Sequence, residues 1–385
     1  NEYLFHKLLI KEGFLALRFD FINVSLNGIN MGIYAIEEAI DKILVENNNY
    51  REGPVIKFND DLNWKAMRSN TFDLNENFLI SEIDAFQKLD PEIDSDKYEK
   101  FLVAKDLINS FRQGHLKTSE VFNVSKLAKL FALTELLGFH HATAFINIRF
   151  YYNPIISKLE PIGYDQTVID KLDIRGLYIE NIQKENFPKL WYNIFLDEKF
   201  IEEYYSALNL FSEKSYLDNF FKNFNEDFSL KKKIINKNYP LYEFHGEQIL
   251  YDNQNYIKNI LNPEKVLRAY LNGVDDSKLI ISIANIQQIP IMALSLMIDG
   301  YELKPLKSNY IKGRIKNSML EYTDVLFSSK NIKYFDSNSI SNENFFLKYK
   351  LISNENIFSE KVKPWPFITK DFLEVKLFKE NKDLF

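Results

Sequence analysis

The spacing of apolar residues changes near residue 270, and this change limits the folds open to the chain. From about residue 178 to residue 262, aromatic and aliphatic side chains recur every three or four residues, which indicates amphipathic helices. The next apolar segment, KLIISIANIQQIPIMALSLMIDG, alternates apolar and polar residues around Pro290, which is typical of β-strands. A chain of 385 residues also exceeds what one hydrophobic core usually serves. We therefore predict two domains, spanning residues 1–265 and 270–385.

Composition excludes several classes of function. The net charge is −6 and the pI is near 5.6, which argues against nucleic-acid binding because phosphate backbones need a basic surface. There is no cysteine, so disulfides, thiolate metal sites and cysteine nucleophiles are excluded. No uninterrupted apolar run reaches about 18 residues, so we expect no transmembrane segment. The first residue is Asn1, and we expect a trimmed N-terminus, so the lack of a signal peptide is uninformative.

The first 60 residues mix helix and strand signals. Residues 1–13 have apolar residues at helical spacing and stop at Gly13. The segment FDFINVSLNGINMGIYAIEE then reads as two strands joined at Asn27-Gly28, with Gly32 at a bulge or a close approach. A helix over residues 38–46 and a short strand carrying Lys57 should follow. The apolar stripe of the first helix comprises Leu4, Phe5, Leu8 and Leu9.

The segment from residue 79 to residue 165 should supply helices and a second hairpin. Helices are expected over residues 79–113, broken at Pro91, and over residues 125–137, capped by Ser125 and ended by Gly138. The stretch INIRFYYNPIISKLEPIGYD then reads as two strands around an Asn-Pro turn. If Ile156 centres the turn, Asn147 and Asp165 face each other with Cβ atoms roughly 5 Å apart. Two oxygen-bearing side chains so placed favour a shared hard cation.

The candidate functional residues are Glu38, Lys57, Asn147 and Asp165. The sequence has no Walker A loop, GxGxxG, HExxH or GxSxG motif. Each candidate alone has an ordinary explanation, such as a solvated strand lysine or a turn aspartate. As a set they match the few parts that phosphoryl transfer requires: a Lys that holds phosphates, a Glu that orients it, and an Asn and an Asp that hold Mg²⁺.

The run FINVSLNGINMGIYAIEEAIDK, the following GPVIKF, and NIRFYYNPIISKLEPIGYD together resemble the CotH kinase family, the atypical kinases related to spore coat protein H. The family's LNG turn matches Asn27-Gly28, and its GxY strand with a following Glu matches Gly32 and Tyr34 with Glu38. The family's Lys matches Lys57, and the Asn of its Asn-containing strand matches Asn147. Its P-I-x-x-D element matches Pro161-Ile162 with Asp165. The resemblance covers roughly residues 1–262. It implies a kinase-like α+β domain with a helical C-terminal part, which binds ATP and Mg²⁺ and phosphorylates a secreted, coat or cell-surface protein. It also implies an extracytoplasmic location: the cell surface, the periplasm or a coat.

Two departures from the family pattern leave a second reading open. Where the family has an aspartate that receives the substrate proton, this chain has Ala142, and His140 and His141 are the nearest polar residues. The family's D-x-D continuation reads Asp165-Gln166-Thr167. His140 or His141 can replace the base, since neutral imidazole accepts a proton near pH 7. Alternatively, the histidines are structural and the domain is a pseudokinase, a nucleotide-binding or structural module in coat or envelope assembly.

The C-terminal domain is expected to be a small all-β domain, an immunoglobulin-like sandwich, with turns at Asp299-Gly300 and near Pro364. Such appended modules often hold a catalytic domain at a surface or bind sugar. The tryptophan of KPWPF, Trp365, favours packing over a carbohydrate contact, and the contact stays an alternative.

Overall fold

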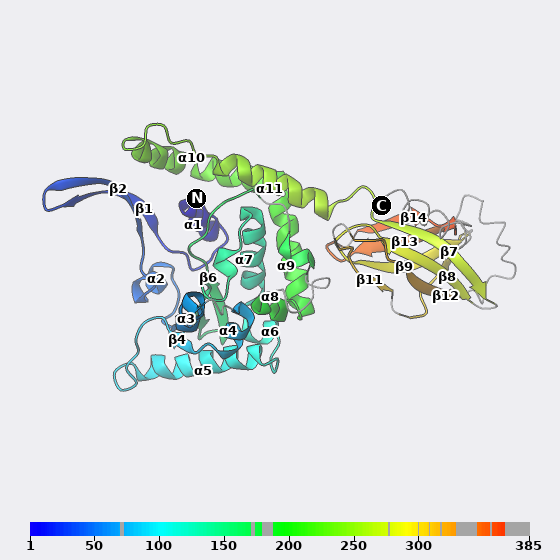
Figure 1. Cartoon of the computed structure of the whole chain (residues 1–385), viewed down its shortest axis with the longest axis horizontal. Coiled ribbons are helices and arrows are strands. Elements are labelled where there is room, and N and C mark those ends of the chain that lie inside the picture. Colours follow the sequence, from blue (N-terminus) through cyan, green and yellow to red (C-terminus); the bar gives the residue numbers. More distant parts are fainter. Residues whose placement is uncertain are drawn as a thin grey trace. The chain divides into compact units, whose positions relative to one another are not determined.

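The computed structural model has an α+β fold and divides into two compact units, Asn1–Asn262 and Pro263–Phe385 (Figure 1). It describes residues 1–69, 73–170, 174–178, 188–275, 278–298, 300–307, 309–315, 318–328, 345–354 and 356–365. The division falls just before the first strand of the second unit, a few residues ahead of the position expected from the change in periodicity.

The first unit opens with the predicted helix and hairpin. Helix α1 (Glu2–Lys11) buries its apolar stripe and stops before Gly13, whose φ is +72°. Strands β1 (Phe19–Leu26) and β2 (Ile29–Glu37) form a long ribbon (Figure 1) joined by Asn27 and Gly28, both with positive φ. The register shifts opposite Gly32, and a Cβ there would lie 2.3 Å from Asn238 Nδ2, so the predicted bulge and close approach are both confirmed.

Helix α2 (Lys42–Asn47) is shorter than the helix expected over residues 38–46. The Glu38 N–H donates to the Arg18 carbonyl, so this residue still extends the β-ladder. The Asp41 side chain accepts hydrogen bonds from the N–H groups of Ile43 and Leu44 and caps the helix. The Asp41 cap therefore sets the start of the helix at Lys42.

The centre of the first unit is an antiparallel sheet of order β4-β3-β5-β6. Its strands are β4 (Ile83–Ala85), β3 (Val55–Phe58), β5 (Arg149–Asn153) and β6 (Lys158–Ile162). The helix predicted over residues 79–113 is wrong at its start, because β4 pairs with β3 there. Pairing with a buried strand thus overrides local helix propensity. The helices of this region are α3 (Asp61–Ser69), α4 (Leu74–Ile80) and α5 (Ser95–Arg112).

A helical layer completes the first unit (Figure 1). Its core is the packing of α7 (Val124–Leu137) on α9 (Glu198–Ser212), with Phe131 and Trp191 fully buried. Helix α7 is capped by Asn123, not by Ser125, and ends at Gly138 with φ +75°, as predicted. The other helices are α6 (Thr118–Val121), α8 (Lys189–Ile194), α10 (Lys214–Asn236) and α11 (Gly246–Leu261), with 3₁₀ turns η1 (His141–Thr143) and η2 (Arg175–Tyr178).

The described part of the second unit contains two β-sheets and no helix. One has the order β12-β8-β7-β15 and the other β10-β9-β13-β14, with β11 paired to β9. Gly300 has a φ of +87° in the β9–β10 turn, while Asp299 lies outside the described residues. The ring of Trp365 packs edge-on against Tyr270 and Tyr322. The strands are β7 (Leu267–Asp275), β8 (Lys278–Asn285), β9 (Ile291–Ile298), β10 (Tyr301–Leu303), β11 (Tyr310–Ile311), β12 (Thr323–Ser328), β13 (Phe345–Leu351), β14 (Ile357–Lys361) and β15 (Lys363–Pro364).

Among the described residues, no helix combines the length and apolar character needed to cross a membrane.

Candidate functional site

The β5–β6 hairpin forms as predicted, but its register differs by one residue from the expected one. Asn153 pairs with Lys158 and Arg149 pairs with Ile162, so the turn comprises residues 154–157. The Asn153 side chain accepts a hydrogen bond from the Ile155 N–H at 3.0 Å, and Ser157 takes a left-handed φ of +51°. This turn geometry, which the sequence pattern does not reveal, means that Asn147 and Asp165 are not cross-strand partners.

Asn147 lies just before β5 and contacts the residue that precedes Asp165. Its amide Nδ2 donates to the Tyr164 carbonyl at 3.2 Å, and the side chain is buried. Within the described residues, no hydrogen bond reaches its Oδ1. The carbonyl oxygen of this side chain is therefore available to a ligand.

Asp165 is exposed and has a left-handed backbone, with φ at +53°. Its N–H donates to Glu2 Oε1 at 2.8 Å. The His141 Nδ1 atom lies 2.8 Å from the Asp165 carbonyl oxygen and 3.3 Å from its Oδ2. A left-handed conformation is unfavourable for a residue other than glycine and often marks a functional position. The contacts with Glu2 and His141 hold Asp165 in this left-handed conformation.

His140 has a different environment from His141. It is buried, and its Nε2 lies 2.8 Å from Oε2 of the fully buried Glu135. Burial alone would raise the pKa of the Glu135 carboxyl, but the His140 charge and hydrogen bond, with further bonds from Gly176 and Tyr204, hold that pKa below its usual range. Of the two histidines expected as a replacement base, His141 contacts Asp165 and His140 is bound in the core.

The position where the family resemblance calls for an aspartate has a structural role here. Ala142 is fully buried, and its N–H donates to Gln166 Oε1 at 2.9 Å. The Gln166 Nε2 amide donates to the carbonyls of Phe139 and Thr167. Gln166 therefore connects the segment after α7 to the segment that presents Asp165.

The expected ion pair between Lys57 and Glu38 is not formed. Glu38 pairs with Arg18 at 2.6 Å and also accepts a hydrogen bond from Asn47. Burial raises the pKa of the Glu38 carboxyl, but the bonds from Arg18 and Asn47 outweigh it and lower the pKa. Arg18 takes this partner because it lies directly across the base of the hairpin. Within the described part of the chain, Lys57 forms no salt bridge.

Arg149 is a candidate that the sequence reasoning missed. It pairs with Lys57 across β3 and β5, so the two side chains lie on one face of the sheet. The guanidinium is buried and donates to the carbonyls of Ile146 and Ile148 and to the Tyr164 hydroxyl, the last at 2.8 Å. Its Nε has no hydrogen-bond partner among the described residues, and no carboxylate there forms a salt bridge with it. Burial consequently lowers the pKa of Arg149.

Acidic groups lie near Arg149 and the Tyr164 hydroxyl that it contacts. Burial raises the pKa of the Tyr164 hydroxyl, and the negative charges of Asp165, Asp60 and Glu37 raise it further, while Arg149 lowers it. Cationic side chains can bind an anion, and nearby carboxylates that form no salt bridge with them can bind the metal ion that accompanies it.

No family model and no curated protein matches this chain.

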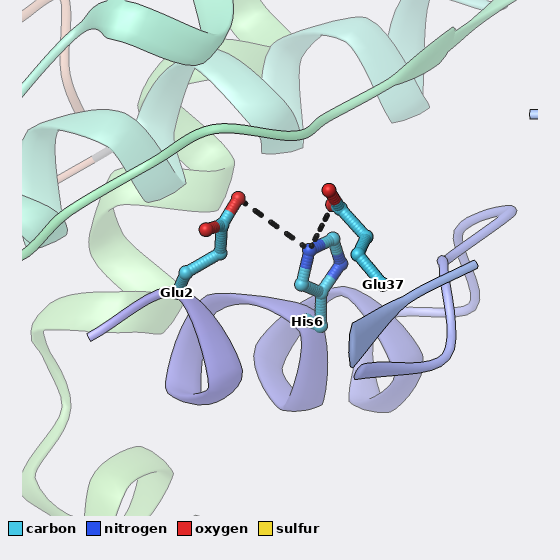
Figure 2. Close-up of side chains that lie close together, drawn as sticks. All are labelled: Glu2, His6 and Glu37. Atoms are coloured by element: carbon cyan, nitrogen blue, oxygen red, sulfur yellow. Dashed lines mark ion pairs between the residues drawn. The ribbon is translucent and has the colours of Figure 1, made fainter. Parts of the chain in front are cut away.

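A second cluster lies beside Asp165 and was also missed. Glu2 and His6 of α1 point toward Glu37 at the end of β2 (Figure 2). The His6 Nε2 atom lies 3.3 Å from Glu37 Oε1 and 4.0 Å from Glu2 Oε1. Burial and the charge of Glu37 raise the pKa of Glu2. The helical spacing of Glu2 and His6 is visible in the sequence, but the approach of Glu37 depends on how the hairpin packs on α1.

Proposed function

We propose that the first unit binds ATP with Mg²⁺ and transfers its γ-phosphoryl group to a hydroxyl of a secreted, coat or cell-surface protein, as a CotH-like atypical kinase. The observation that carries this proposal is Arg149. A buried guanidinium without a carboxylate partner is costly unless an anion completes it. Phosphate is a suitable anion because it accepts the paired N–H groups of arginine.

Lys57 supports the same ligand. It lies beside Arg149 on the sheet face and forms no salt bridge within the described residues. Two such cations favour a polyphosphate over a single carboxylate, because each can contact a different phosphate group. In this proposal Lys57 holds the phosphates without orientation by Glu38, which Arg18 already engages.

Asn147 and Asp165 fit the cation that accompanies the nucleotide. The Asn147 Oδ1 atom and the exposed Asp165 carboxylate offer the hard oxygen ligands that Mg²⁺ prefers. Mg²⁺ neutralises phosphate charge when bound. His141, which contacts Asp165, is better placed than His140 to accept the proton of the substrate hydroxyl.

A second function, that of a pseudokinase, is favoured by two observations. The Glu38 carboxylate is engaged by Arg18, and Ala142 is buried where a catalytic carboxylate is expected from the resemblance. In that version the same residues bind nucleotide without transfer, and the chain serves as a module in coat or envelope assembly. The kinase-like fold of the first unit and an immunoglobulin-like sandwich in the second belong to both versions, as does an extracytoplasmic location. A carbohydrate contact at Trp365 stays an alternative to its packing on Tyr270 and Tyr322.

The test is a phosphoryl-transfer assay on the full chain with ATP, Mg²⁺ and casein as a hydroxyl-rich acceptor, together with thermal unfolding. Lys57→Met and Asp165→Asn are compared with Lys42→Met, which removes an exposed lysine that pairs with Glu46 and Glu52. Transfer that both site variants abolish and the control retains supports the kinase. Stabilisation by ATP without transfer supports the pseudokinase. If ATP produces neither effect in the wild-type chain, both versions are rejected.

A further inference from the structure

Glu2, His6 and Glu37 converge on one point between α1 and the end of β2 (Figure 2). One ligand atom of each residue lies within 4.8 Å of the others. The three side chains come from two elements separated along the chain, so their convergence is a product of the fold.

His6 is the informative member of the cluster. Its side chain is only 2% exposed, and neither ring nitrogen has a hydrogen-bond partner among the described residues. Buried imidazoles normally satisfy at least one nitrogen. The ring stacks on Phe19, which fixes its plane, and Nε2 points between the two carboxylates (Figure 2). Nε2 can therefore give its lone pair to a metal ion held between these carboxylates.

The charges at the cluster also favour a cation. Within the described residues, no lysine or arginine forms a salt bridge with Glu2 or Glu37, and the only basic group within 4.0 Å of their carboxylates is the His6 ring. Nearby Lys7 is paired with Asp227 at 2.8 Å, and Arg18 is engaged by Glu38. The two carboxylates are therefore short of positive charge.

The distances fit a metal ion. In a tetrahedral zinc site with bonds of about 2.0–2.2 Å, ligand atoms lie roughly 3.3–3.6 Å apart. The His6 Nε2 to Glu37 Oε1 distance is 3.3 Å. Glu2 Oε1 is farther from Nε2, at 4.0 Å, which a small rotation of this partly exposed side chain corrects.

We propose that Glu2, His6 and Glu37 bind a divalent transition-metal ion, with Zn²⁺ preferred and a fourth position occupied by water. Imidazole disfavours Mg²⁺, and a site of this kind binds Zn²⁺ more tightly than Mn²⁺. His6 and Glu37 line a groove of about 480 Å³ between α1 and the hairpin, which gives the ion and the water access.

The ion connects α1 to β2 and supports the segment that carries Asp165. Glu2 Oε1 accepts the Asp165 N–H, so fixing Glu2 also fixes the backbone of that residue. This inference does not depend on ATP binding, because none of its three ligands belongs to the phosphate or Mg²⁺ sets.

The test is calorimetric titration of Zn²⁺ into the metal-free full chain. One saturable site is expected. His6→Phe keeps the aromatic stacking and removes the ligand atom, and Glu37→Gln removes a partly exposed carboxylate; each should weaken Zn²⁺ binding about 100-fold or more, since even outer-shell changes cost about 10–100-fold. His245→Ala, which removes an exposed histidine, should leave binding unchanged.

Asp165→Ala separates this site from the proposed function. The backbone N–H that Glu2 accepts persists in this variant, so Zn²⁺ binding should survive while any phosphoryl transfer is lost. The inference is overturned if the wild-type chain shows no saturable Zn²⁺ site. It is also overturned if His6→Phe and Glu37→Gln, shown by circular dichroism to be folded, bind Zn²⁺ as tightly as the wild type, or if Asp165→Ala abolishes binding.

Discussion

Replacing Glu135 by leucine should destabilise the first unit strongly. The carboxylate is fully buried and receives four hydrogen bonds: Oε1 accepts from the Tyr204 hydroxyl and the Gly176 N–H, and Oε2 lies within 3.2 Å of the Arg175 N–H and 2.8 Å of His140 Nε2. Leucine fills a similar volume but accepts none of them. Each buried donor left unpaired costs about 1–3 kcal/mol, so even the lower limit gives a loss of about 4 kcal/mol. Breaking a buried ion pair costs a similar amount.

Tryptophan fluorescence during urea unfolding provides the assay. The chain has three tryptophans, and Trp191 is fully buried, whereas Trp64 and Trp365 are 53% and 37% exposed. The Trp191 ring lies 5.2 Å from the His140 ring, so its emission reports on this part of the core. Glu135→Gln is the matched variant. Its carbonyl oxygen can serve one pair of donors and neutral His140 can accept from its amide, so we expect about half the loss, roughly 2 kcal/mol.

A loss below about 1 kcal/mol in Glu135→Leu would refute the reasoning, because it would mean that the donors find other partners or that the carboxylate is not buried. His140 would then be free of the structural role assigned to it and would again compete with His141 as the catalytic base.

Three further predictions concern the same unit. Burial raises the pKa of the Glu160 carboxyl, but its bonds to Lys126 and Asn153 lower that pKa overall. The contribution of this carboxylate to stability is therefore present above the unfolded pKa of about 4.3 and is lost as pH falls through the lower folded value. The difference in unfolding free energy between wild type and Glu160→Gln, measured in urea, should be larger at pH 7 than at about pH 3, and a difference independent of pH would contradict this. Gly163→Ala should lower the free energy of unfolding by about 1–3 kcal/mol in the same assay, because the added Cβ would lie 2.7 Å from Phe5 Cζ; an unchanged midpoint would show that α1 does not pack on this segment. Glu38→Gln should change stability by less than about 1 kcal/mol, because Arg18 is largely exposed, and a larger loss would show that the bonds of Glu38 to Arg18 and Asn47 are stronger than those of an exposed ion pair.

The sequence predicts the elements whose signals are local. The Asn27-Gly28 hairpin, the end of α7 at Gly138 and the alternating strands around Pro290 depend on turn chemistry and periodicity alone, and all three are present. The β4 strand was not predicted, since its three residues become a strand only by pairing with β3. The same limit applies to the hairpin register, which the Asn153 side chain and the left-handed Ser157 set together.

In the candidate site, too, the sequence predicts the features with local signals and not those that depend on packing. The segments that carry Lys57, Asn147 and Asp165 could be placed on strands or at their ends from the sequence. The partner of Glu38 could not, because Arg18 reaches it only through the closure of the β1–β2 base. The importance of Arg149 depends on its burial without a carboxylate, and that of His6 on the approach of Glu37. Both are properties of packing, and neither has a signature in the spacing of residues.

The central claim is that the sheet face carrying Lys57 and Arg149 receives the phosphates of a nucleotide. Calorimetric titration of ATP into the full chain with excess Mg²⁺ tests it most directly. We predict one saturable site in the wild-type chain, retained in Lys42→Met and lost in Lys57→Met. A folded wild-type chain that gives no saturable heat with millimolar ATP, or a Lys57→Met variant that binds ATP as well as the wild type, would contradict the claim.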